Sequence, residues 1–110
     1  MNWQQQKRDT QAAAYADAVI DTLAGDFPDL NDPIMADTVR TCMRAYMHTG
    51  HLEVIMDDPY LARWRLTADR DHPGRVRIGC WHTPPLSDSV REREARINAA
   101  LAAIGTETQR

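Results

Sequence analysis

The sequence predicts an α+β fold in which two N-terminal helices, a three-stranded antiparallel β-meander and a C-terminal helix follow one another in the order α-α-β-β-β-α. Residues 60–68 and 75–82 alternate between apolar and polar side chains, the period-two pattern of half-buried strands. Residues 3–24, 33–49 and 87–104 instead repeat apolar side chains at helical spacing. With 43% hydrophobic and 26% charged residues, the 110-residue chain can bury one core, so we expect a single domain over residues 1–110.

The first helix is expected over residues 3–24. Its apolar stripe consists of Ala12, Tyr15, Ala16, Val19, Ile20 and Leu23. Gly25 offers a left-handed conformation that stops the helix. Because the first turns are mostly polar, residues 1–8 are expected to fray, and so is the tail at residues 106–110.

The second helix has clear signals at both ends. Asp32 is a good N-cap, Pro33 suits the first helical position, and Gly50 ends the helix. The face between them is broadly apolar: Met35, Val39, Cys42, Met43, Tyr46 and Met47. At this spacing the methionines are expected in the core and not on a binding surface.

Three strands and a helix complete the prediction. Residues 51–56 form a short strand that ends at the Asp57-Asp58-Pro59 turn, and a hairpin with Pro73-Gly74 in its turn follows. The third helix is expected over residues 87–104, with Gly105 past its end. Helices cover one face of such a sheet, and antiparallel sheets tolerate one face in water.

The hairpin separates its side chains into two unlike faces. The inner face is apolar: Ala62, Trp64, Leu66, Val76, Ile78 and Cys80. The outer face is the candidate partner-binding site: Arg63, Arg65, Arg75, Arg77 and Trp81. If Leu66 pairs with Ile78 and Trp64 with Cys80, then Arg63 lies opposite Trp81 and Arg65 opposite Gly79. Arginine and tryptophan are frequent at binding hot spots, and Gly79 would leave a gap for a partner. The competing interpretation is that these arginines only solubilise an open sheet.

The charge distribution bears on the class of partner. Residues 1–60 hold four basic and ten acidic side chains, while residues 61–110 hold nine basic and six acidic ones. A basic surface with an aromatic side chain suits single-stranded nucleic acid. The net charge of −3 opposes that interpretation, because dedicated nucleic-acid-binding domains are usually strongly basic.

No catalytic, cofactor or metal motif stands out. Cys42 falls on an apolar helix face, where a thiol is not activated. His48 and His51, with Cys80 and His82, do not have the spacing of a zinc site. We therefore expect no enzymatic activity, no cofactor and no bound metal.

These observations lead to a functional hypothesis. No apolar run is long enough for a transmembrane helix and no secretory signal is evident, so we expect a cytoplasmic protein with no membrane partner. The hypothesis is a small non-enzymatic binding protein that docks on a macromolecule, first of all a protein. Bacterial or phage accessory proteins of inhibitor, immunity or adaptor type have this profile. A nucleic-acid-binding regulator that uses the basic hairpin and a structural subunit that forms homodimers remain as alternatives.

Overall fold

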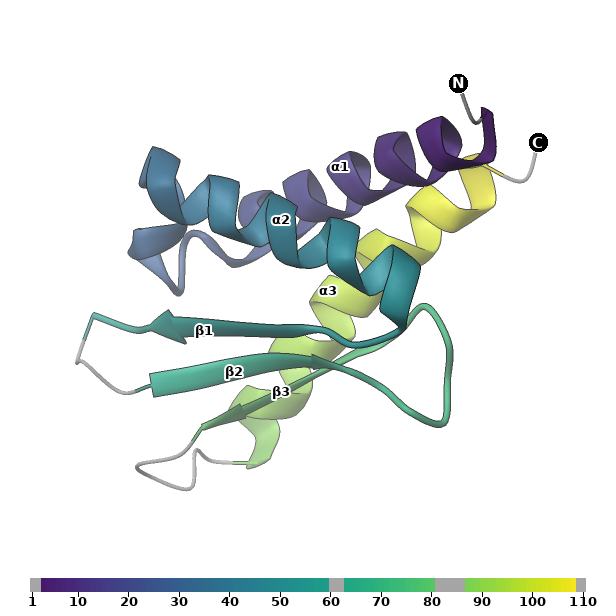
Figure 1. The fold of residues 1–110 in the computed structure, drawn as a ribbon. Coiled ribbons are helices and arrows are strands. Elements are labelled where there is room, and N and C mark those ends of the chain that lie inside the picture. The colour runs from purple at the N-terminus through teal and green to yellow at the C-terminus, as the bar shows by residue number, and fades with distance from the viewer. Residues whose placement is uncertain (1–2, 60–62, 81–86, 109–110) are drawn as a thin grey trace.

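A computed structural model describes residues 3–59, 63–80 and 87–108 (Figure 1). Its elements, in chain order, are α1 (Trp3–Leu23), a short 3-10 helix η1 (Pro28–Asn31), α2 (Pro33–Thr49), β1 (Glu53–Asp57), β2 (Arg63–Ala68), β3 (Val76–Cys80) and α3 (Ser87–Thr108). The three strands form one antiparallel sheet in the order β1-β2-β3. The predicted α+β class and element order are confirmed.

Helix α2 begins and ends where the sequence predicts. The Asp32 side chain accepts a hydrogen bond from the Ile34 amide at 2.8 Å, and Pro33 occupies the first turn. At the other end, Gly50 adopts φ +74° and its amide donates to the Tyr46 carbonyl. A side chain at this left-handed position would be strained, which explains why glycine ends the helix.

The hairpin has the predicted register. Leu66 pairs with Ile78, Trp64 with Cys80, and Arg65 with Gly79. On the other side of β2, Leu66 pairs with Val54. The predicted pairing of Arg63 with Trp81 lies outside the described residues.

The sheet turns one face toward the helices. In Figure 1, α3 crosses behind the strands, while α1 and α2 lie side by side above them. The strand side chains on the helical side are almost completely buried: Val54, Met56, Trp64, Leu66, Val76 and Ile78. They join one core with α1, α2, α3 and the loop residues Phe27 and Leu30. Met43 is also buried and Met35 and Met47 are partly buried against this core, as predicted for the methionine face. Each fully buried large apolar side chain contributes about 1.5–3 kcal/mol to folding.

Side chains of α3 close the outer edge of β3. The Asn98 amide nitrogen donates to the Val76 carbonyl at 3.0 Å, and the Val76 amide donates to the Asn98 Oδ1 at 2.8 Å. The Ile78 amide donates to Glu94 Oε1 at 3.0 Å. These bonds satisfy backbone groups that an edge strand would otherwise expose to another chain.

The end of α3 differs from the prediction. The helix continues through Gly105 to Thr108, although we expected it to stop before Gly105. Glycine inside a helix costs about 1 kcal/mol relative to alanine but does not break the helix. The alanine-rich turns before Gly105 favour helix strongly enough for α3 to continue past it. The expected fraying at residues 1–8 and 106–110 stays a prediction; residues 1, 2, 109 and 110 lie outside the described residues.

The loop between β2 and β3 is ordered by Asp69. Its carboxylate accepts a hydrogen bond from the Asp71 amide at 3.0 Å and lies 3.3 Å from the His72 ring. The Asp69 amide also donates to the Arg75 carbonyl at 2.9 Å, and Gly74 has φ +86°. The Gly74 amide reaches the Tyr46 hydroxyl at 3.4 Å, which ties the loop to α2.

The Asp69 carboxylate makes the stability of this loop depend on pH. The pKa of Asp69 lies below its usual value of 3.8, first because the Asp71 amide donates to the carboxylate and then because His72 and Arg77 lie near it. A carboxyl whose pKa is lowered by folding stabilises the protein above its unfolded pKa, and this contribution is lost as pH falls through the folded value. We therefore expect Asp69→Ala to lower the melting temperature at neutral pH and to differ less from wild type at about pH 2.5. Thermal melts of both proteins at the two pH values test this, and an unchanged difference would contradict it.

Candidate interaction surface

The side of the sheet that faces away from the helices is the candidate interaction surface, hereafter the open face. Because strand side chains alternate, it carries every second residue of each strand. Its members are Glu53, Ile55 and Asp57 on β1, Arg63, Arg65 and Thr67 on β2, and Arg77 and Gly79 on β3. Cross-strand pairing arranges them in rows, of which Ile55–Arg65–Gly79 is the central one.

Each arginine of the open face lies beside a carboxylate. Arg63 Nε is 3.3 Å from Asp57 Oδ1, and Arg65 Nη1 is 3.5 Å from Glu53 Oε2. Arg77 Nε lies 3.9 Å from Glu94 Oε1 at the sheet edge. All three arginine side chains are more than two-fifths exposed, so each ion pair contributes less than about 1 kcal/mol to stability. The pairs do change the charge of the surface. The hairpin sequence alone predicted a basic surface, but the open face carries both acidic and basic side chains.

The predicted site residues fall into three groups. Arg63, Arg65 and Arg77 share the open face as predicted, and Arg75 is exposed in the hairpin loop directly before β3. Trp81, the fifth predicted site residue, lies outside the described residues.

The sequence prediction did not include the contribution of β1 to this surface. Glu53, Ile55 and Asp57 lie on the open face because Val54 and Met56 point into the core. The same alternation is visible in the sequence from Glu53 to Asp57, so the period-two rule could have placed these side chains. Their pairing with arginines could not be read from it, because that depends on the β1–β2 register.

The central row of the open face has a projecting apolar side chain at one end and a glycine at the other. Ile55 is 42% exposed, although isoleucine is among the most often buried residue types. Gly79 lies in the same row, on the other side of Arg65, and a Cβ atom built there would meet no atom of the described residues within 4 Å. A partner side chain therefore has an apolar contact at one end of the row and free space at the other.

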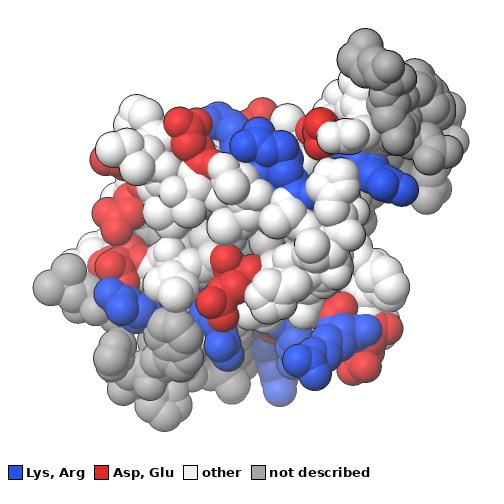
Figure 2. Space-filling view, in the orientation of Figure 1, with Lys and Arg blue, Asp and Glu red and all other residues white. Residues whose placement is uncertain are grey.

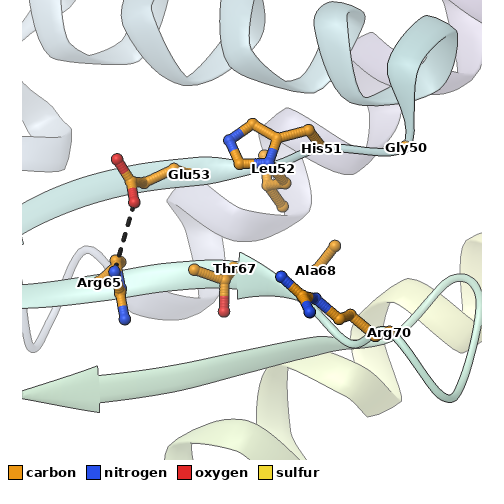
Figure 3. A pocket seen from close by; sticks show the side chains of 8 residues that line it. All are labelled: Gly50, His51, Leu52, Glu53, Arg65, Thr67, Ala68 and Arg70. Carbon is orange, nitrogen blue, oxygen red and sulfur yellow. Dashed lines mark ion pairs between the residues drawn. The ribbon is translucent and has the colours of Figure 1, made fainter.

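A shallow hollow of about 270 Å³ adjoins this centre. Figure 3 shows that its lining residues come from the link between α2 and β1, the start of β1, and β2 with the loop after it, and that the Glu53–Arg65 ion pair lies at one end. Arg70 and His51 also line it. Because Glu53, the acidic side chain of its lining, is paired with Arg65 and the hollow is open to solvent, it resembles a depression in a docking surface more than an enclosed ligand pocket.

The space-filling view agrees with this charge pattern. Figure 2 shows acidic and basic side chains interspersed on the face turned to the viewer, without a continuous basic area. Grey residues at the lower left and upper right of this view are not described, so the statement holds for the described part of the face.

The thiol and histidine side chains that the sequence singled out do not gather in the described part. Burial, and secondarily the charge of Glu53, raise the pKa of Cys42, so this thiol stays protonated at neutral pH. His48 Nε2 lies 3.8 Å from an Asp9 carboxylate oxygen. No group of three or more potential metal ligands occurs among the described residues; the Cys80 side chain and His82 lie outside them.

Within residues 3–59, 63–80 and 87–108, no helix combines the length and the hydrophobicity needed to cross a bilayer. Comparison with known proteins finds no matching family model, no matching curated protein and no matching solved structure. The function of the open face is therefore inferred from its own chemistry.

Proposed function

We propose that this protein is a non-enzymatic binding protein whose open face docks on a protein partner. The observation that carries the proposal is the central row, in which the exposed Ile55 and the gap at Gly79 flank Arg65. An exposed apolar side chain among charged ones is a common combination at a protein–protein interface. Inhibitors, immunity proteins and adaptors of bacteria or phages act by such docking, and we place the protein in this functional class.

The mixed charge of the surface supports a protein partner over nucleic acid. A phosphate that approached Arg63 or Arg65 would also approach Asp57 or Glu53, which lie within 3.5 Å of these arginines. Nucleic-acid binding draws its affinity from unopposed cations, and the carboxylates would repel the phosphates. A protein surface can instead match both signs of charge.

Substitution of Ile55 tests the proposal. We expect Ile55→Asp to reduce capture of the partner from a lysate of the source cells by at least about tenfold, because it replaces the exposed apolar contact of the central row with a charge. Ile34→Asp is the matched control, since Ile34 is 78% exposed but lies on α2 outside the sheet. The control should capture the partner like wild type, and both variants should keep the wild-type circular dichroism spectrum.

Two results would count against a protein-docking face. In one, Ile55→Asp captures the same proteins in the same amounts as wild type. In the other, the retained material is nucleic acid and the purified protein shifts DNA or RNA with a steep dependence on salt, which is the signature of phosphate contacts.

A further inference from the structure

We propose that the partner docked on the open face is a second copy of this chain, related by a two-fold axis that runs along β2. The inference rests on the proposed function, because it takes the open face to be a protein-docking surface and identifies the partner that docks there. It follows from the order of side chains across the sheet, which makes this surface complementary to itself.

Symmetry determines which residues meet. A two-fold axis along the central strand, lying between two facing sheets, places β1 of one copy over β3 of the other and β2 over β2. Each cross-strand row then lies over the same row of the second copy, with its order reversed. Facing sheets of this kind pack about 10 Å apart with nearly aligned strands.

The central row fits itself under this operation. In the row Ile55–Arg65–Gly79, reversal places Ile55 of each copy over Gly79 of the other. Ile55 is 42% exposed, and among the residues that the structure describes no atom lies within 4 Å of a Cβ position built on Gly79. The projecting side chain therefore fills the gap twice in one dimer, and both apolar groups leave water.

The neighbouring row is complementary in charge. Glu53, Thr67 and Arg77 form one row, so the axis along β2 places Glu53 of each copy over Arg77 of the other. A two-fold axis across the strands would instead place β1 over β1, with Glu53 facing Asp57 of the second copy, and like charges would oppose it. The arrangement of charges therefore selects the axis along β2.

The arginines of β2 lie near this axis but are drawn away from it. Arg63 and Arg65 form ion pairs with Asp57 and Glu53, which are on β1 of the same copy. Since the two β1 strands lie on opposite sides of the axis, the two sets of guanidinium groups lean in opposite directions. This divergence limits the repulsion between the copies.

The size of the face predicts a weak dimer. Three strands of about five residues cover roughly 14 by 17 Å, well below the ~800 Å² that each partner buries in a standard interface. We therefore expect a dissociation constant in the micromolar range, about 10–100 µM. Sedimentation velocity from about 1 to 300 µM protein brackets this range.

Reversing the charge of Glu53 or Arg77 tests the proposed geometry, because only this geometry brings these two side chains of different copies together. Glu53→Arg alone places arginine over arginine, and Arg77→Glu alone places glutamate over glutamate. Since the contact occurs twice in a symmetric dimer, each single variant should weaken association by about tenfold. An equimolar mixture of the two variants should restore it to the wild-type level, because both contacts of the mixed dimer then join opposite charges.

The matched control is the pair Asp37→Arg and Arg44→Glu, which changes net charge by the same amounts at exposed positions of α2. These variants, alone or mixed, should associate like wild type. The proposal is overturned if wild type stays monomeric across the range, or if a wild-type dimer is insensitive to the two reversals on the sheet. A third outcome separates the two proposals. If the wild type is monomeric but captures another protein from the lysate, and Ile55→Asp does not capture it, the second copy is refuted as the partner. The proposed docking function then still holds.

Discussion

Trp64→Ala is expected to lower the free energy of unfolding by about 3–5 kcal/mol, the range for removing a large aromatic side chain from a core. Trp64 is 5% exposed and packs edge-on against Phe27, with ring centroids 5.5 Å apart and an interplanar angle of 70°. The Arg93 guanidinium carbon lies 4.9 Å from the centroid of the indole ring. One substitution therefore removes an aromatic pair, a cation–π contact to α3 and the apolar area that the indole ring buries in the core.

Urea denaturation followed by far-UV circular dichroism measures this loss. Trp64 also makes a hydrogen bond, because its Nε1 donates to Asp58 Oδ2 at 3.0 Å. Trp64→Phe separates the ring contacts from this hydrogen bond, since it keeps an aromatic ring but removes the donor. We expect this variant to lose about 1–2 kcal/mol. Ile34→Ala, at an exposed position on α2, should change stability by less than about 0.5 kcal/mol. A Trp64→Ala protein as stable as Ile34→Ala would show that the indole does not hold the sheet to the helices.

Trp64 also shows why the strand pairing could be predicted from the sequence. Both arms of the hairpin place apolar residues at every second position, and a shift of one residue would turn every apolar side chain toward water. The pairing of Trp64 with Cys80 and of Arg65 with Gly79 follows from that constraint. Local signals of the same quality, such as Asp32 before Pro33, located the start of α2.

The candidate surface was less predictable, because its character depends on contacts between segments distant in the sequence. Arg65 and Glu53 are brought together by the β1–β2 pairing, and Arg77 and Glu94 by the packing of α3 against β3. No local pattern distinguishes an arginine that will meet a carboxylate from one that will face water. The hairpin alone therefore predicted a basic surface, while the folded sheet has one of mixed charge.

The mixed charge has a consequence for how a partner is recognised. Exposed ion pairs contribute little to stability, so the fold does not need Glu53 or Asp57 beside the arginines. On a docking surface, however, opposite charges at fixed positions discriminate between orientations, because the wrong orientation brings like charges together. For the proposed docking on a protein, the carboxylates of β1 thus favour specific contact over the general attraction of a basic sheet.

Asn98→Ala is expected to destabilise the protein by about 2 kcal/mol, since it leaves the Val76 amide and carbonyl without their side-chain partners. Alanine is the better helix former, so the measured loss underestimates the value of the two hydrogen bonds. Glu92→Ala, at an exposed position of α3, is the matched control and should change stability by less than about 0.5 kcal/mol. Equal stabilities of Asn98→Ala and Glu92→Ala would show that water replaces Asn98 at no cost.

Asn98→Asp separates the two bonds that Asn98 makes. The aspartate keeps an acceptor for the Val76 amide but loses the donor to the Val76 carbonyl, and near neutral pH its carboxylate would oppose that carbonyl at about the 3.0 Å of the present bond. Hydrogen exchange read by NMR should therefore show a faster Val76 amide in Asn98→Ala than in Asn98→Asp, although both proteins are less stable than wild type. Because the same bonds close the edge of β3, Asn98→Ala should also increase aggregation at high protein concentration, as unpaired edge strands do. If the Val76 amide exchanges in Asn98→Ala at the wild-type rate, then Glu94, which binds the Ile78 amide, and not Asn98 protects the edge of β3.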